Sequence, residues 1–180
     1  MTEPPIIAPL PAPETWEGAY GGITAGTRMS GDMTYTPGPS YPSLEPGRNV
    51  GLFGGYNVQN GKLVFGGEVA YSRASGYGPV GFPTENFTYF LDGKLRAGLA
   101  TDRVLFYGFA GYTTGSYEIS PVTWNVSGAN YGIGVDALVN DNFFLGGEFI
   151  IRNLSGDTNI PGQVQDTTIR ALQLRAGWKF

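Results

Sequence analysis

The 180-residue chain contains 29 glycines, 11 tyrosines and 11 phenylalanines but only 14% charged residues, a composition that favours strands over helices. Its formal net charge of −4, without any cluster of basic residues, argues against nucleic-acid binding. Because it has no cysteine, disulfides, thiolate nucleophiles and zinc–thiolate sites are excluded. No apolar run is long enough for a transmembrane helix, which leaves transmembrane strands open because they are short and alternating.

Residues 1–15 include five prolines, which favour an extended, polyproline-like arm. We interpret this segment as a periplasmic arm left after signal-peptide cleavage, with recruitment of another envelope protein as the alternative. The N-terminus lacks the basic segment and apolar core of a signal peptide, so we expect a mature, exported form. Residues 16–180 are then the second part of the chain, a folded domain.

From Trp16 onward the pattern predicts eight strands of about ten residues each. In chain order they cover 16–27, 49–59, 62–73, 86–100, 104–117, 123–139, 143–154 and 167–180. Asn60-Gly61 is a hairpin signal, and 101–103 and 140–142 are similarly short turns. The segments 28–47, 74–85 and 155–166 are longer and rich in turn-forming residues. This alternation of long and short connections is typical of an up-and-down antiparallel barrel.

Charged residues within a predicted strand fall on one face, because successive side chains of a strand point to opposite sides. In strand 86–100, Asp92, Lys94 and Arg96 share one face, while the other face, from Phe87 to Leu99, carries no charge. The strand 104–117 is large and apolar on both faces and cannot be phased in this way. The strand 16–27 is mostly small, and we phase Ala19, Gly21, Ile23 and Ala25 outward.

Two architectures produce such strands: a soluble barrel or sandwich with its apolar face inward, and a membrane barrel with its apolar face toward lipid. The polar face here is mostly Gly, Ala, Ser and Asn with single charges, which suits a narrow interior better than a water-facing surface. Aromatic residues also gather toward strand ends, as membrane-interface girdles do. They are Tyr71, Phe87, Tyr89, Tyr131, Phe143, Phe149, Trp178 and Phe180. We therefore favour an all-β, eight-stranded antiparallel transmembrane barrel, with the soluble barrel as the alternative.

Four stretches also carry a family resemblance: "WEGAYGG", "GLFGGYNVQNGKLVFGGEVAYS", "LRAGLATDRVLFYGFAGY" and "YGIGVDALVNDNFFLGGEF". In order and spacing they resemble the small eight-stranded outer-membrane β-barrel proteins of Gram-negative bacteria, the opacity-protein and OmpA-transmembrane-domain-like group. The resemblance covers residues 16–180. It implies residence in the Gram-negative outer membrane among outer-membrane lipid and lipopolysaccharide, with short periplasmic turns and long extracellular loops.

The C-terminal "LRAGWKF" is similar to the ending of these proteins. The resemblance implies that Trp178 and Phe180 belong to a signal that the outer-membrane assembly machinery reads. The first strand is richer in glycine than in the family, and the Pro-rich arm stands where a signal peptide would be.

An eight-stranded barrel is only wide enough for side chains inside. The phasing places there the charged residues Glu68, Asp92, Lys94, Arg96, Asp136, Glu148, Arg152 and Arg175, with Lys179 as a further candidate. Because unpaired buried charges are costly, we expect a salt-bridged plug in which Arg96 and Arg175 pair with Glu68, Asp136 or Glu148. The alternative is a narrow path for ions or small solutes.

The chain has no histidine. Enzymes of this barrel class resemble one another in using a histidine with serine or related partners, so we expect no catalytic residue and no enzyme. The acids of the last loop, Asp157 and Asp166, lack a second acidic pair. Scattered acids such as these are usually only solvated, and we expect neither a metal site nor a cofactor.

Tyrosine and proline dominate the long connections, which is typical of surfaces that contact other molecules. Tyr35, Tyr41, Tyr77 and Phe82 are the candidate contact residues. The sequence therefore favours a structural, envelope-integrity barrel. A surface adhesin or ligand binder that uses these loops, or a protein partner at the loops or the arm, is the second hypothesis, and a small pore is the third.

Overall fold

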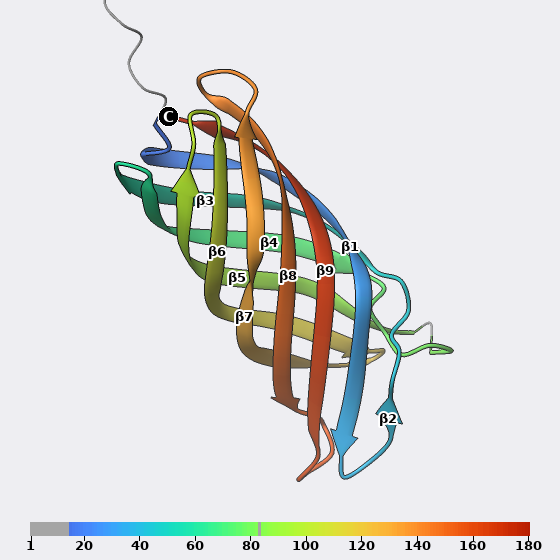
Figure 1. Ribbon diagram of the computed structural model, residues 1–180. Helices are drawn as coiled ribbons and strands as arrows, with labels where there is room; N and C mark the ends of the chain where they lie inside the picture. Colours follow the sequence, from blue (N-terminus) through green and yellow to red (C-terminus); the bar gives the residue numbers. More distant parts are fainter. Residues whose placement is uncertain (1–14, 83) are drawn as a thin grey trace, which may run out of the picture.

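The computed structural model describes residues 15–82 and 84–180, so the predicted Pro-rich arm lies outside them except for Thr15. Within these residues the chain forms strands and no helix, and hence no helix that could span a membrane. The strands are β1 (Gly18–Thr36), β2 (Ser40–Tyr41), β3 (Arg48–Asn60), β4 (Leu63–Ser75), β5 (Glu85–Ala100), β6 (Val104–Ile119), β7 (Val122–Leu138), β8 (Phe143–Asp157) and β9 (Val164–Lys179) (Figure 1).

Eight long strands close into a barrel, as predicted. Each pairs antiparallel with its sequence neighbours, and β1 also pairs with β9, so that the first and last strands form a seam (Figure 1). The two-residue β2 adds only a short edge to β1. A row of paired residues that begins at Ile23 passes once around the barrel and returns to β1 at Thr34. The strands are therefore steeply tilted around a narrow interior.

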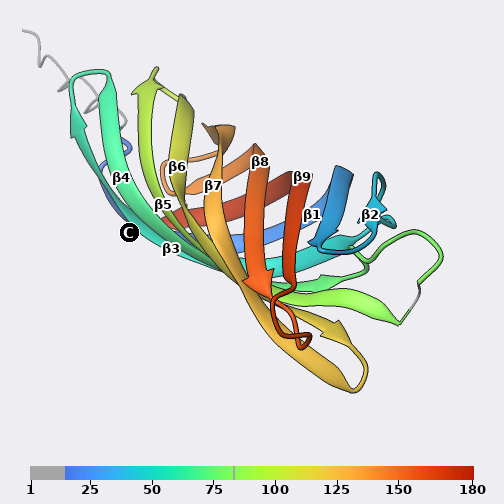
Figure 2. The same cartoon turned by 90° about the horizontal axis from the view of Figure 1, so that it is seen from below.

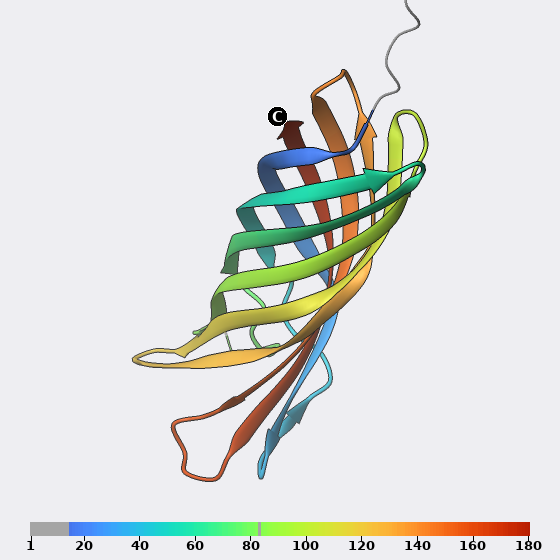
Figure 3. The same ribbon diagram turned by 90° about the vertical axis from the view of Figure 1, so that its left-hand side faces the viewer.

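The two ends of the barrel differ. The turns β3–β4, β5–β6 and β7–β8 lie at the same end as the C-terminus (Figure 1). At the other end the hairpins β6–β7 and β8–β9 and the end of β1 extend beyond the rest of the wall (Figure 3). Long loops were expected at 28–47 and 155–166, but much of both segments is strand, because β1 and β9 stay paired up to Thr36 and Val164. The predicted long loops are therefore partly wrong, and extended hairpins take their place.

The outer face of the wall is apolar. Leu95, Leu174 and Ile133 are among its most exposed side chains, at 76%, 68% and 67%. Ile23 also points outward, which confirms the phase chosen for the first strand. In β6, which the sequence left unphased, Tyr107 points inward.

Phe87 departs from its expected outward position, because it is fully buried. The pairing of β5 with β6 shifts by one residue between Phe87 and Tyr89. Such a bulge resets the alternation, so Phe87 and Phe90 both point inward although their parity differs. The prediction of an outward Phe87 was wrong because the sequence does not mark the bulge.

Two interior clusters of apolar side chains occupy the two ends of the barrel. The cluster toward the short turns includes Trp16, Phe53 and Phe144. The cluster toward the long hairpins includes Met33 and Trp124. Polar and charged side chains lie between and among them, and they form the site described next.

Candidate functional site

All eight charged residues that the sequence places inside the barrel are buried, none more than 5% exposed. They come from β4 (Glu68), β5 (Asp92, Lys94, Arg96), β7 (Asp136), β8 (Glu148, Arg152) and β9 (Arg175). Four acids thus face four bases, and the group as a whole is neutral. Burial of this kind is tolerated only when each charge finds a partner of opposite sign.

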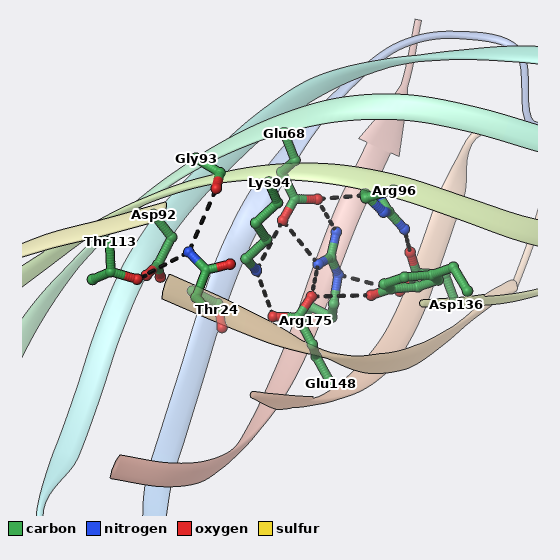
Figure 4. Close-up of polar contacts among 12 residues, drawn as sticks. Thr24, Glu68, Asp92, Gly93, Lys94, Arg96, Thr113, Asp136, Glu148 and Arg175 are labelled. Atoms are coloured by element: carbon green, nitrogen blue, oxygen red, sulfur yellow. Dashed lines mark hydrogen bonds and ion pairs between the residues drawn. The ribbon is translucent and has the colours of Figure 1, made fainter. Parts of the chain in front are cut away.

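Glu68 is the centre of the larger group of ion pairs (Figure 4). Its Oε2 lies 2.7 Å from Nη2 of Arg175 and 3.1 Å from Nη1 of Arg96. Its Oε1 lies 3.3 Å from Nζ of Lys94. One carboxylate therefore meets all three basic side chains of this group.

The same three bases also reach two other carboxylates. Nη1 of Arg175 lies 2.9 Å from Oε2 of Glu148, and Nη2 of Arg96 lies 2.9 Å from Oδ2 of Asp136. Arg175 also approaches Asp136, and Lys94 donates to Glu148 (Figure 4). We call these three acids and three bases the charge ring; its members are Glu68, Lys94, Arg96, Asp136, Glu148 and Arg175. Of the partners expected for the two arginines, Arg175 contacts all three acids, whereas Arg96 contacts Glu68 and Asp136.

Asp92 and Arg152 form a second, separate pair nearer the long hairpins. Nε and Nη2 of Arg152 donate to the two carboxylate oxygens of Asp92 at 2.9 and 2.6 Å, a two-pronged contact. Thr113 donates to Asp92 Oδ1 at 2.6 Å, and Asn130 in turn donates to Thr113 at 2.9 Å. Asp92 is thus the carboxylate on which the wholly buried Arg152 depends.

Aromatic rings cover the basic side chains. The guanidinium of Arg96 lies 3.8 Å from the ring centre of Tyr107, and that of Arg175 lies 4.1 Å from Phe53. Tyr20 donates to Glu68 at 3.0 Å and accepts from Arg96. Such cation–ring contacts stabilise charges that have left water. Sequence reasoning missed these aromatic partners, because it searched for charges only.

Glycines on neighbouring strands make room for two of the rings. A Cβ on Gly134 would overlap the ring of Tyr107, and one on Gly132 would overlap Phe109. Phe109 in turn lies under Lys94, whose Nζ is 4.7 Å from the ring centre. Large residues in one strand opposite glycines in the next were the signal that could have phased β6.

The end with the short turns is closed by Trp16, only 2% exposed, which packs edge-on against Phe144. The backbone of Trp16 is held by Asn57, whose side-chain amide donates to its carbonyl at 3.2 Å. Lys179, the further candidate for the interior, is buried; it lies over the Trp16 ring and donates to the Thr15 carbonyl. This mouth is therefore filled by the start of the described chain.

Two connections fold together over the opposite mouth. Leu44 pairs with Pro79, and the Glu45 amide donates to the Gly78 carbonyl at 2.6 Å. Tyr77 is fully buried beneath them and donates to Asn49 at 3.2 Å. Burial raises the pKa of the Tyr77 phenol to about 12, so it remains a donor.

Of the four predicted contact residues of the loops, two are buried and two are at least partly exposed. Tyr77 is buried and Tyr35, at the end of β1, is 8% exposed, so neither offers the expected contact surface; both pack into the interior instead. Phe82 is 43% exposed and Tyr41 is half-buried, and their rings contact each other edge-on. The loops therefore present fewer free aromatic rings than the sequence predicted.

A hollow of about 240 Å³ lies between the rim segments at this end. Tyr41 and Trp124 are among its aromatic lining residues, and Glu85 and Gln163 among its polar ones. It draws residues from β1, β2, β5, β6 and β7 and from the β8–β9 connection.

The last residues lie on the wall at the other end. Trp178 and Phe180 are 48% and 82% exposed, and Trp178 pairs with Gly21 on one side and Phe143 on the other. Both side chains thus belong to the exterior apolar surface. Their part in assembly stays a prediction.

Comparison with known proteins agrees with this architecture. The family described as "Outer membrane protein beta-barrel domain" matches residues 6–180. The "22 kDa outer membrane protein" of Rhizobium leguminosarum bv. viciae is 31% identical over 139 residues, which cover 75% of this chain and 63% of that protein. The match thus spans less than two thirds of the relative's length.

Solved structures show the same fold at low identity. Neisserial surface protein A has a TM-score of 0.57 at 17% identity, over 91% of this chain and 100% of that one. The N-terminal barrel of Pseudomonas aeruginosa OprF has a TM-score of 0.51 at 14% identity, over 91% of this chain and 98% of that one. Yersinia pestis Ail, in complex with the heparin analogue sucrose octasulfate, has a TM-score of 0.52 at 16% identity, over 91% of this chain and 99% of that one.

The family match, together with the closed barrel and its apolar exterior, shows that the chain belongs to the outer membrane β-barrel family and is a bacterial outer-membrane protein with a salt-bridge network buried inside the barrel.

Proposed function

We propose that the protein is a non-catalytic, sealed wall element of the outer membrane, whose role is envelope integrity. The charge ring is the observation that carries this proposal. It places six mutually paired charges across the interior, between two apolar clusters. A water-filled path would have to separate these pairs, in which each charge contacts two or three charges of opposite sign.

The same contacts argue against catalysis and transport. A catalytic acid or base needs access to a substrate. The interior carboxylates are instead paired and at most 3% exposed. With no histidine in the chain, a serine hydroxyl also has no imidazole base.

Conductance in planar bilayers tests the sealed interior. We expect the wild type to insert without steady current. Arg175→Ala leaves three acids of the ring with two bases, and we expect it to admit water and give a cation-selective conductance. Insertion is checked by heat-dependent gel migration. Steady wild-type currents that vanish when Arg96 or Arg175 is substituted would favour the pore instead.

A deletion strain tests the envelope role. We expect loss of the gene to increase sensitivity to bile salts and large antibiotics, with full rescue by the wild type. Rescue by a variant that folds but leaks, such as Arg175→Ala, should be incomplete. A deletion strain with unchanged permeability would contradict the proposal.

The rim hollow favours a second candidate, binding of a small extracellular ligand. Tyr41 and Trp124 supply aromatic faces and Glu85 and Gln163 polar groups, a combination suited to a neutral sugar. Saturation-transfer NMR with a panel of neutral oligosaccharides tests it. Tyr41→Ala should abolish the transfer, whereas Val80→Ala, an exposed loop change outside the hollow, should not. Equal signals from both variants would rule this candidate out.

A further inference from the structure

We propose that the exterior wall around β1, β3, β4 and β9 binds an anionic glycolipid of the outer leaflet, with Arg48 and Arg73 holding its charged headgroup. The proposal goes beyond the envelope role; it depends on the outer-membrane location and on an orientation with the long hairpins outside the cell, as the family resemblance implies. β3 and β4 lie side by side in the wall (Figure 2).

The two arginines stand at the border of the apolar exterior. Read from the Asn60-Gly61 turn, the outward face of β3 passes only uncharged positions from Val58 to Val50 before it reaches Arg48. The outward face of β4 passes only uncharged positions from Leu63 to Tyr71 before it reaches Arg73. Both arginines are exposed. Because each is the first charge that its outward face reaches after the apolar stretch, we place them where the hydrocarbon gives way to headgroups.

Aromatic residues mark the same level. Tyr71 precedes Arg73 on its face, and Tyr89 pairs with Arg73 across the strands. Their rings are stacked, with centres 5.9 Å apart. Outward tyrosines at this position are typical of a membrane interface.

Neither guanidinium has a partner of opposite charge among the described residues. The residues paired with Arg48 are Thr27 and Ser75, and those paired with Arg73 are Val50 and Tyr89. The two arginines are diagonal neighbours across β3 and β4, close enough for long side chains to share one ligand. Two like charges in this position repel each other, and an anion between them removes that cost.

Two hollows meet at this place. A small one, of about 210 Å³, is lined by Arg48, Arg73 and Val50. A larger one, of about 590 Å³, lies on the adjoining lipid-facing wall and also includes Val50; Ala25 and Leu174 are among its mostly apolar lining. A basic hollow thus continues into an apolar groove.

A basic hollow that continues into an apolar groove indicates the chemical class of the ligand. The groove faces the apolar exterior, where acyl chains are the available occupants, and the basic hollow lies at headgroup level. A molecule with both parts is an anionic lipid, and guanidinium groups bind phosphate or carboxylate through two parallel hydrogen bonds. The outer leaflet's anionic glycolipid fits both hollows at once.

Native mass spectrometry of the detergent-solubilised protein with bisphosphorylated lipid A tests the proposal. We expect the wild type to retain lipid A and to bind its dephosphorylated form at least about tenfold more weakly. Arg48→Gln with Arg73→Gln should weaken binding of the phosphorylated form by about tenfold for each guanidinium. Ala25→Leu, which fills the groove, should weaken both forms.

Matched controls keep the test specific. Arg170→Gln changes an outward arginine that already pairs with Asp32 at 3.4 Å, and Ala129→Leu enlarges an outward alanine of β7 that lies outside the groove. Neither should alter binding. The proposal is overturned if the controls weaken binding as much as the site variants, if both lipid forms bind wild type equally, or if inorganic phosphate at equal concentration displaces the lipid. The comparison of lipid forms needs no variant, so it holds even if a variant misfolds.

Discussion

The charge ring and the Asp92–Arg152 pair are two ways of pairing buried charges inside one barrel. In the ring, Glu68 contacts three bases and Arg175 contacts three acids, so each charge keeps a partner when one contact is lost. In the pair, the fully buried Arg152 has Asp92 as its carboxylate partner, supported by Thr113. Redundancy thus distinguishes the ring, and dependence on one carboxylate distinguishes the pair.

We expect the largest loss of stability from a substitution that breaks the Asp92–Arg152 pair. Asp92→Asn leaves Arg152 buried without its counter-charge, so we expect a loss of about 3–5 kcal/mol in the free energy of unfolding. Urea unfolding in lipid vesicles, followed by tryptophan fluorescence, measures it. The double variant Asp92→Leu with Arg152→Met removes both charges and should recover most of the loss. A loss below that of the ring variant described next would contradict the comparison.

Substitution of one member of the charge ring should lower the free energy of unfolding by less. In Lys94→Met, Glu68 and Glu148 both keep Arg175, so we expect a loss of about 1–3 kcal/mol. The same urea titration compares it directly with Asp92→Asn. If the ring variant proves the more destabilising, redundancy does not protect the ring.

The packing of aromatic side chains over the charge ring can be tested by substituting a glycine that makes room for one of them. Gly134→Val would force its side chain against the Tyr107 ring that covers Arg96, and we expect a loss of about 1–3 kcal/mol. Gly147→Ala is the matched control, because its Cβ would meet nothing closer than 3.8 Å; it should change stability by less than about 0.5 kcal/mol. Equal losses of stability in the two variants would mean that Tyr107 is not tightly packed over the charge ring.

The smallest expected effect lies above the pair, where Tyr77 packs on Phe90 and Phe90 covers Arg152. Tyr77→Phe loses the hydrogen bond to Asn49, about 1 kcal/mol. Because the pKa of Tyr77 is raised to about 12 in the folded protein, its contribution is complete below pH 10 and is lost as the pH rises toward 12. The stability difference between wild type and variant should therefore shrink over this range, with Tyr131→Phe as an exposed control. A constant difference would contradict this assignment.

Sequence reasoning found the interior charges because alternation along a strand is strict where no bulge intervenes. It placed Asp92, Lys94 and Arg96 on one face of one strand, and all three are buried. It failed at Phe87, since a bulge reverses the alternation without any mark in the sequence. It also left 104–117 unphased, because Tyr107 and Phe109 are large on the face where small or charged residues were expected.

The loops were harder for a different reason. Tyrosine and proline predict exposed connections, but strand pairing across the β1–β9 seam extends into both segments and carries Tyr35 inward. Packing between two connections likewise buries Tyr77. Such contacts depend on which segments meet in space, and local composition does not encode that.

The position of Arg175 on the last strand has a consequence for the order of assembly. The other five members of the charge ring lie on β4, β5, β7 and β8. A growing sheet that lacks β9 therefore holds three acids against two bases on its inner face, and its seam edge is also unpaired. Docking of β9 supplies the missing cation and the missing hydrogen bonds in the same step. Neutralisation and closure are thereby coupled, and we expect a sheet without β9 to be less stable in lipid than the closed barrel.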